Sequence, residues 1–283
     1  MIPTTFSYHR ANSVSEALQL LRECGEDAKL LAGGHSLIPA MKLRLNQPEH
    51  LIDISRMSDI RYIKVEGGML KIGAGATHSD IAKSSDVRQH LPMLAETAAL
   101  IGDPAVRNKG TMGGVMAHAD PAADYPAPLL VAGAEIVIQA AGGERVVPLT
   151  SFLTGLFETD LGEQEILTEV RMPVFPSNTK STYQKFMQPA SRYAIVGCAA
   201  MASVDGGTFS NVRMAFSSVG DKAFRASDVE NALNGQPCSE DAINNAVQHA
   251  VNGVDVLSDH FASVEYRSHV AKVYAKRALM ALL

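Results

Sequence analysis

The spacing of apolar residues predicts a small α/β unit at the start of the chain. Ser13 and Glu16 have the spacing of a helix capping box. Apolar residues then recur at helical intervals, at Val14, Ala17, Leu18 and Leu21. Short apolar runs at 28–31 and 50–54 predict buried strands. Together these elements predict a βαβ-like first lobe.

A hairpin and a group of helices are predicted next. The segments 62–65 and 69–72 flank Gly67 and Gly68, and a type I′ turn needs positive φ at both central positions. Thr77 and Asp80 mark a helix start. The pattern predicts helices at about 93–100 and 126–131, and strands at 135–139, 145–147 and 166–172.

The pattern changes after residues 173–179, where two prolines, a serine and an asparagine suggest a linker. Strands are expected at 182–186, 195–204 and 209–216, followed by three helices. Ser227 with Glu230 should cap the first helix and Gly235 should end it; Ser239 should open the second, and 264–282 should form the third. We therefore expect three units, 1–57, 58–175 and 178–283, the last an α+β domain with a three-stranded sheet.

Two glycine pairs are the strongest chemical signal. The apolar run at 30–32 ends in Gly33-Gly34-His35-Ser36. A second glycine pair follows about eighty residues later, in Thr111-Met112-Gly113-Gly114-Val115. Glycines let successive N–H groups point into one concavity that binds an anion such as a pyrophosphate. Two such loops suggest one phosphate-rich ligand, although each pair alone is also ordinary turn chemistry.

Composition limits the class of protein. With 283 residues, 46% hydrophobic, the chain has enough apolar material for substantial cores. A net charge of −5 without blocks of one sign shows no nucleic-acid or membrane-surface footprint. We expect a cytoplasmic protein, because neither a signal peptide nor a spanning apolar run is present. Three dispersed cysteines are too few for an iron–sulfur cluster, which normally needs four.

The glycine segments resemble those of a known family. Ala32-Gly33-Gly34-His35-Ser36-Leu37-Ile38-Pro39, Thr111-Met112-Gly113-Gly114 and Asp120-Pro121-Ala122-Ala123-Asp124 are similar to the flavin-binding segments of the FAD-binding medium subunit of molybdenum hydroxylases, of the carbon monoxide dehydrogenase and xanthine dehydrogenase type. The likeness runs nearly end to end. It implies an α+β fold: a two-lobed FAD-binding domain of the PCMH, or vanillyl-alcohol-oxidase-like, type, followed by the C-terminal domain.

The resemblance also implies site residues. Residues 32–36 and 111–115 would surround the diphosphate and ribityl chain of FAD, mainly through backbone N–H groups. Val115 departs from the serine or asparagine that is common in the family, which removes one side-chain hydrogen bond. Asp124 would bind sugar or ribityl hydroxyls, Leu167 would lie along the cofactor, and Lys185 would lie near its polar end. Without the family, Asp124 is also a candidate N-cap before Pro126, and Lys185 a solvated strand charge.

Tyr193 and Ile101 would lie beside the isoalloxazine ring by the same resemblance, although an exposed strand tyrosine is the simpler interpretation of Tyr193 alone. His35 and His118 lack metal-ligand spacing, so we expect no metal site. Asp120 and Asp124 resemble a catalytic carboxylate pair, but flavin redox chemistry needs none. Met41, Met112 and Met116 are explained as core residues.

The expected function is electron relay. As the family implies, electrons from a large molybdenum subunit would pass through a small [2Fe-2S] subunit to noncovalently bound FAD and then to an external acceptor, in a dimer of heterotrimers. We expect no catalytic residue in this chain. The substrate (carbon monoxide, an aldehyde, a purine or an N-heterocycle) and the acceptor stay open. The alternatives are a self-sufficient flavin oxidase or dehydrogenase, and a flavin-free nucleotide-binding scaffold.

The two glycine pairs should also be intolerant of side chains. We expect alanine at Gly33 or Gly114 to force the loop out of its φ range or into the pyrophosphate, with loss of flavin from a folded protein.

Overall fold

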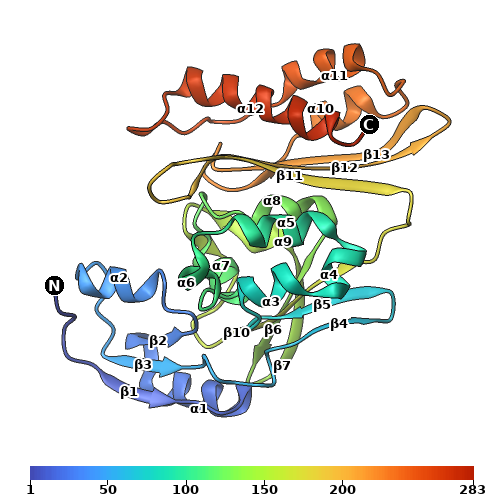
Figure 1. The fold of residues 1–283 in the computed structure, drawn as a ribbon. Helices are drawn as coiled ribbons and strands as arrows, with labels where there is room; N and C mark the ends of the chain where they lie inside the picture. Colours follow the sequence, from blue (N-terminus) through green and yellow to red (C-terminus); the bar gives the residue numbers. More distant parts are fainter.

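The computed structural model describes all residues from 1 to 283, and its first lobe is a parallel three-stranded sheet (Figure 1). The strands are β1 (Ser7–Arg10), β2 (Ala28–Leu31) and β3 (His50–Asp53), in the order β1-β3-β2. The helix α1 (Val14–Cys24) and a 3-10 turn (Gly25–Asp27) connect β1 to β2, and α2 (Leu37–Lys42) precedes β3.

The apolar face of α1 packs into the core of this lobe. Ser13 caps the helix, as predicted, because its side chain accepts a hydrogen bond from the Glu16 N–H. The apolar face of α1 packs on Ile52, which is completely buried, and Ile166 of the second lobe belongs to the same core. The first lobe is therefore completed by a residue more than a hundred positions further along the chain.

The second lobe is built on a five-stranded antiparallel sheet in the order β4-β5-β10-β6-β7. These strands are β4 (Ile63–Glu66), β5 (Met69–Gly73), β6 (Glu135–Ala140), β7 (Gly143–Pro148) and β10 (Ile166–Pro173), and β8 (Leu153–Gly155) pairs separately with β9 (Glu158–Thr159). Gly67 and Gly68 have φ of 60° and 74°, which confirms the predicted hairpin turn.

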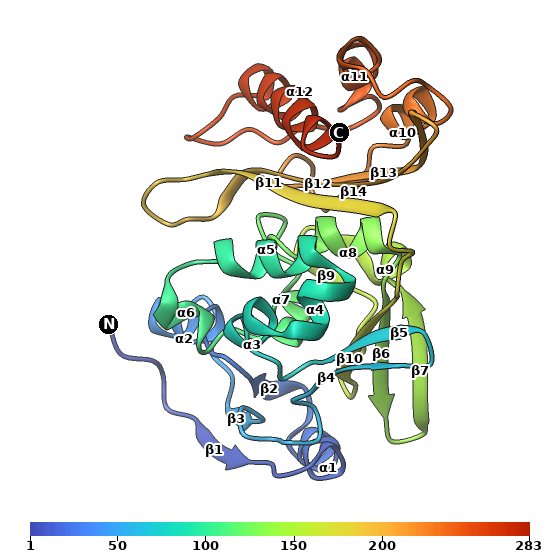
Figure 2. The same ribbon diagram turned by 45° about the vertical axis from the view of Figure 1, so that its right-hand side comes forward.

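Helices fill the long connection between β5 and β6 and cover one face of this sheet (Figure 2). They are α3 (His78–Lys83), α4 (Ser85–His90), α5 (Pro92–Leu100), α6 (Pro104–Arg107), α7 (Met112–His118) and α8 (Pro126–Ala132); α9 (Leu149–Phe152) follows β7. Thr77 and Asp80 form a capping box at the start of α3, which confirms the predicted helix start. The second glycine segment therefore lies at the start of a helix, whereas the first lies in a loop.

The C-terminal part is a four-stranded antiparallel sheet with three helices on one face. Its elements are β11 (Thr179–Met187), β12 (Ala194–Asp205), β13 (Thr208–Ser217), β14 (Phe224–Arg225), α10 (Ser227–Leu233), α11 (Glu240–Ala246), a 3-10 turn (Val247–His249) and α12 (Val264–Met280). The two-residue strand β14 was not predicted, because two residues carry no periodicity.

The predicted cap of α10 is wrong. Ser227 is the first residue of the helix, and the N-cap position falls on Ala226, which provides no side-chain hydrogen bond. Glu230 cannot close a capping box because its carboxylate binds the Arg225 guanidinium and accepts from the Met214 N–H. Ser239 does cap α11, as predicted.

The C-terminal sheet is covered on both faces. One face carries α10, α11 and α12, and the other lies on α5 and α8 of the second lobe (Figure 1). Residues 194–203 of the central strand β12 are all buried, and Met201 shares the core of the second lobe. The three parts therefore form one stacked molecule.

Candidate functional site

The first glycine loop presents a row of unpaired backbone donors. It follows β2 and leads into α2, and the N–H groups of residues 33–36 donate to no protein acceptor. Gly34 has φ of 73°, which suits glycine, and His35 Nδ1 lies 3.0 Å from the Gly33 carbonyl oxygen. Successive unpaired N–H groups in a loop of this kind form an anion-binding concavity.

The second glycine segment has its donors engaged. The N–H groups of Met112 and Gly113 donate to the carbonyls of Ala76 and Ala74, at 3.0 and 2.8 Å. Those of Gly114 and Val115 donate to the hydroxyl and the carbonyl of Thr111, both at 3.1 Å. Within 111–115 only the Thr111 N–H lacks a protein acceptor. The two motifs therefore differ: the first offers donors, and the second is fixed to the lobe beneath it.

The two segments pack directly on each other at Gly33. A Cβ built on Gly33 would lie 2.8 Å from Gly110 Cα and would overlap the Lys109 carbonyl oxygen. Gly33 does not have positive φ, so our expected φ constraint is wrong for this residue, and its first obstacle is the neighbouring loop. At Gly114, where φ is also not positive, a Cβ would lie 2.9 Å from Thr111 Oγ1. The close approach of the two backbones explains why residue 33 is a glycine.

Asp124 and Lys185 form a buried ion pair. Lys185 Nζ lies 2.8 Å from Asp124 Oδ2 and donates to the Leu100 carbonyl at 3.3 Å, while the Tyr183 hydroxyl donates to Asp124 Oδ1 at 2.6 Å. The Lys185 side chain is 1% exposed and that of Asp124 is 7% exposed. Lys185 is therefore not a solvated strand charge. The N-cap interpretation of Asp124 is also wrong, because Tyr125 occupies that position.

Burial dominates the ionisation of this cluster. It raises the pKa of the Asp124 carboxyl, and the Lys185 ammonium and the Tyr183 hydroxyl act in the opposite direction. Burial, with the nearby Asp124 carboxylate, also raises the pKa of Tyr183 well above its ordinary value. Tyr183 therefore stays protonated and donates its hydrogen bond.

A turn of the C-terminal sheet reaches the second lobe beside Ile101. The turn joins β11 to β12, and its Arg192 donates to the Gly102 carbonyl at 3.2 Å. Arg107 donates to the carbonyls of Ile101 and Gly102, at 2.9 Å each. Tyr193 follows Arg192 in this turn and is 48% exposed; burial, Asp120 and Asp124 raise the pKa of its phenol. The structure therefore brings the Ile101 and Tyr193 segments together.

His78 is a site residue that the sequence did not indicate. It is 2% exposed, its Nδ1 lies 3.1 Å from the Tyr125 hydroxyl, and a Cβ on Gly110 would overlap its Nε2. Burial first, then the charges of His35 and Arg107, lower the pKa of His78 to about 4. His78 is therefore neutral at pH 7, and it supports the loop that packs on Gly33. Its only sequence signal was its place after the cap Thr77.

The other predicted site residues lie mostly in or against the cores of the two lobes. Leu167 is buried in the core of the second lobe, on β10, and the carbonyl of its neighbour Thr168 accepts from Ala74 N–H. Val115 is half-buried against the same core. Ala32 packs against the core of the first lobe, and Ser36 is exposed at the start of α2 without capping it.

The catalytic alternatives gain no geometric support. Asp120 accepts from the Ala122 N–H at 2.9 Å, whereas Asp124 binds Lys185 and Tyr183, so the two carboxylates belong to separate hydrogen-bond networks. The ring of His118 packs against Phe157, with the ring centroids 5.2 Å apart. Met41, Met112 and Met116 are buried, as expected for core residues.

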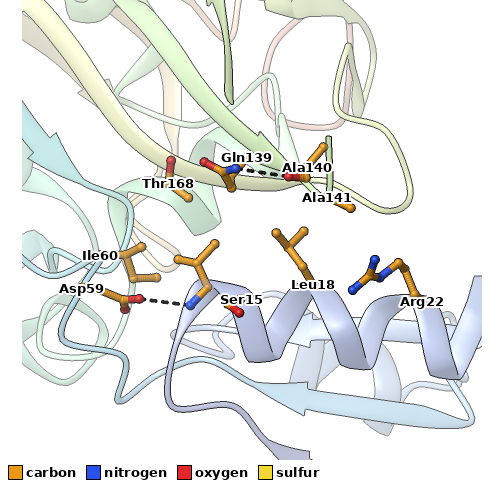
Figure 3. Close-up of a pocket in the computed structure, with 10 residues that line it drawn as sticks. Ser15, Leu18, Arg22, Asp59, Ile60, Gln139, Ala140, Ala141 and Thr168 are labelled. Atoms are coloured by element: carbon orange, nitrogen blue, oxygen red, sulfur yellow. Dashed lines mark hydrogen bonds between the residues drawn. The ribbon is translucent and has the colours of Figure 1, made fainter. Parts of the chain in front are cut away.

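A cavity of about 520 Å³ lies elsewhere, between α1 and the β6–β7 turn (Figure 3). Leu18 and Arg22 line it from the first lobe, and Gln139 and Thr168 from the second, while Asp59 at its edge accepts a hydrogen bond from the Val14 N–H at 3.0 Å. It contains none of the predicted site residues. The candidate site is instead the region around the first glycine loop.

The fold has two lobes whose glycine segments meet, and a row of unpaired backbone N–H groups suited to a phosphate-bearing cofactor lies at that junction. Comparison with known families agrees: residues 4–175 match the FAD binding domain in molybdopterin dehydrogenase, and residues 181–282 match the CO dehydrogenase flavoprotein C-terminal domain. The chain belongs to the family of FAD-binding medium subunits of molybdenum hydroxylases, and it is an oxidoreductase subunit with FAD as its cofactor.

Similar proteins cover the whole chain. The carbon monoxide dehydrogenase medium chain of Hydrogenophaga pseudoflava is 41% identical over 281 residues, which is 99% of this chain and 98% of that one. The glyceraldehyde dehydrogenase medium chain of Sulfolobus acidocaldarius is 35% identical over 98% of each chain. The solved structure of Hydrogenophaga pseudoflava carbon monoxide dehydrogenase lacking the Mo-pyranopterin moiety matches with a TM-score of 0.96 and 42% identity, over 100% of this chain and 98% of that one. None of the helices is long and apolar enough to span a bilayer.

Proposed function

We propose that this chain binds FAD at the junction of its two glycine segments and relays electrons from iron–sulfur clusters of a partner subunit to an external acceptor. The observation that supports this most directly is the row of unpaired N–H groups at residues 33–36. A diphosphate needs such donors, and the loop lies on the segment 109–110, so both lobes border it. The residues present therefore fit the cofactor.

The roles of the residues follow from their hydrogen bonds. The loop 33–36 would hold the diphosphate, assisted by the Thr111 N–H and the positive charge of Arg107. Lys185 and Asp124, which neutralise each other, would position the segment that ends at Leu100. In this arrangement Asp124 orients Lys185 and also accepts from a ribityl or sugar hydroxyl, because a carboxylate has about four lone-pair sites.

Ile101 and Tyr193 would border the ring. Arg192 holds their two segments together through the Gly102 carbonyl. Bound FAD supplies the redox chemistry, while this chain provides position and electrostatics. Tyr193 would shield one face of the ring, and no residue of the chain is assigned to proton transfer.

We further propose that the relay requires a large molybdenum subunit and a small [2Fe-2S] subunit, in a dimer of heterotrimers. Three dispersed cysteines cannot bind a cluster, so electrons must arrive across an interface. Relatives of this chain are medium chains of enzymes named for different substrates, carbon monoxide dehydrogenase and glyceraldehyde dehydrogenase, so we assign the choice of substrate to the large subunit.

The test compares the isolated chain with the assembled complex. FAD in the isolated chain should be reduced by dithionite but by no candidate substrate under anaerobic conditions, and substrate reduction should appear when the partner subunits are added. Acid precipitation should release the FAD into the supernatant, because the binding is noncovalent. Stoichiometric reduction of the flavin by a small organic substrate, in a preparation containing only this chain, would contradict the relay and favour a self-sufficient flavoenzyme.

A further inference from the structure

Two histidines and a cysteine, side chains of types that can bind a metal, meet in the first lobe, away from the glycine segments. His9 lies on β1, His50 begins β3, and Cys24 is the last residue of α1. One possible ligand atom from each lies within 4.8 Å of the other two, and all three side chains are half-buried. The positions are 15 and 26 residues apart in sequence, so no motif spacing revealed them.

The fold brings these residues together for identifiable reasons. In the parallel pairing, His9 lies opposite Ile52, and His50 is two positions before Ile52 on β3. Since side chains alternate along a strand, both histidines lie on the face of the sheet that α1 covers. Cys24 packs against the same core at the end of α1. The cluster is therefore fixed by the sheet register and the length of one helix.

The distances fit a tetrahedral metal centre. His9 Nε2 lies 3.1 Å from His50 Nδ1 and 3.8 Å from Cys24 Sγ. Around a tetrahedral Zn²⁺, with bonds of about 2.0–2.1 Å to nitrogen and about 2.3 Å to sulfur, neighbouring ligand atoms are about 3.3 Å (N to N) and about 3.6 Å (N to S) apart. Small side-chain movements would complete this geometry.

Hydrogen bonding alone satisfies the cluster poorly. Both short contacts use the same atom, His9 Nε2. An imidazole nitrogen has either one proton or one lone pair in the ring plane, so it cannot make two well-directed hydrogen bonds to His50 and Cys24. A cation at the centre accepts one lone pair from each of the three groups and removes the conflict.

We propose that His9, Cys24 and His50 bind a zinc ion, or another borderline-soft divalent metal, with a water molecule in the fourth position. Two imidazoles and one thiolate form a donor set that favours Zn²⁺, whereas Ca²⁺ and Mg²⁺ favour oxygen ligands. The ion would join the edge strand β1 to the end of α1 and to the central strand β3. Its role is structural, because it would tie three elements of the first lobe together and the two short contacts within the cluster involve no flavin-site residue.

Co²⁺ provides the spectroscopic test on the full-length, FAD-loaded chain after chelator treatment. The wild type should bind one Co²⁺ per chain with a thiolate-to-cobalt charge-transfer band, and Zn²⁺ should displace it. Cys24→Ser should lose the band, and His9→Ala and His50→Ala should weaken Zn²⁺ binding at least tenfold, with FAD content unchanged. Cys238→Ser is the matched control, because Cys238 is also half-buried, and it should keep the band.

A second measurement uses only the wild type, so variant misfolding does not affect it. One equivalent of Zn²⁺ should slow alkylation of Cys24 at least tenfold, as followed by peptide mass spectrometry, and leave the rate at Cys238 unchanged. Absence of the charge-transfer band in wild type, an equal band in Cys24→Ser, or equal alkylation of Cys24 with and without Zn²⁺ would overturn the proposal.

Discussion

At Gly33, the absence of one methyl group lets two distant loops lie against each other. Gly33→Ala should separate them, because the new Cβ would overlap the backbone of residues 109–110. Overpacking of this kind costs about 1–3 kcal/mol, so FAD should bind roughly 5- to 150-fold more weakly while the fold persists. Equilibrium titration of the apoprotein with FAD measures the effect.

Gly142→Ala is the matched control for Gly33. A Cβ at Gly142 meets nothing within 4 Å, and its φ is not positive, so this variant should bind FAD like the wild type. Equal FAD affinities for the two alanine variants would show that contact between the loops is not needed for the cofactor.

The buried pair Lys185–Asp124 should be sensitive to the loss of one partner. Lys185→Met leaves the Asp124 carboxylate without its cation at a 7% exposed site, and removing one member of a buried pair costs about 3–5 kcal/mol. The double variant Lys185→Met/Asp124→Asn should recover much of the loss. Urea unfolding gives the three free energies.

An exposed pair provides the comparison. Lys276 lies 2.6 Å from Glu240, but these side chains are 38% and 58% exposed. Lys276→Met should therefore cost much less stability than Lys185→Met. A similarly small cost for Lys185→Met would contradict the structural role of the buried pair.

His78 should make stability depend on pH. Its pKa is about 4 when folded and 6.5 in the unfolded reference, so between these values the unfolded chain binds more protons. The contribution of neutral His78 to the free energy of unfolding is therefore fully present above pH 6.5. It is lost as the pH falls towards 4, by about 3 kcal/mol at 1.36 kcal/mol per pKa unit.

The variant His78→Gln removes this group and should flatten the decline between pH 6.5 and 4 in urea unfolding. His118→Gln, at an exposed histidine, should leave the wild-type pH profile unchanged. An equally steep decline in His78→Gln would assign the acid sensitivity to other groups.

Sequence reasoning located the glycine loops but not their partners. Residues 33–36 and 111–115 stood out because glycine pairs after apolar runs have a local conformational meaning. His78 and Tyr183 carried no such signal, since their roles come from contacts with Tyr125 and Asp124, 47 and 59 positions away. Such contacts depend on tertiary packing.

Among the elements, the turn between β11 and β12 has the clearest functional consequence. Tyr193→Ala should leave FAD bound, because in the proposed arrangement the glycine loop holds the diphosphate, but should change the reduction potential or the rate of reoxidation by oxygen. Spectroelectrochemistry and stopped-flow reoxidation measure these two quantities.

Tyr266→Ala is the control for Tyr193. Tyr266 is similarly exposed, 47% against 48%, but lies on α12, where it packs near Phe186. It should change neither quantity. If Tyr193→Ala also changes neither, Tyr193 does not border the ring.

The predicted helices and strands agree with the structure where the sequence signal involves only neighbouring residues. The hairpin at Gly67–Gly68 and the helix start at Thr77 and Asp80 depend on residues close in sequence, and both were confirmed. The cap of α10 was wrong because Glu230 binds Arg225 and Met214, a strand contact that outweighed the local pattern. A local sequence signal predicts a helix cap correctly only when no tertiary contact binds the capping side chain instead.

At the scale of the whole molecule, the C-terminal sheet covers the helices of the second lobe. Met201 and Tyr183 are part of that lobe's core, so a fragment of residues 1–175 would expose the apolar surfaces of α5 and α8. Expressed alone, this fragment should aggregate, and coexpression with residues 176–283 should restore a soluble species on size exclusion. A monomeric, FAD-binding 1–175 fragment would show that the C-terminal part is dispensable for stability.

The central position of β10 sets the order in which the chain can mature during synthesis. β10 lies between β5 and β6, and its first residue, Ile166, completes the core beneath α1. A nascent chain that already exposes both glycine segments still lacks this strand, so neither lobe is closed when they leave the ribosome. Cofactor loading must therefore wait until residue 173 has emerged, and until then the unpaired edges of β5 and β6 are available to chaperones.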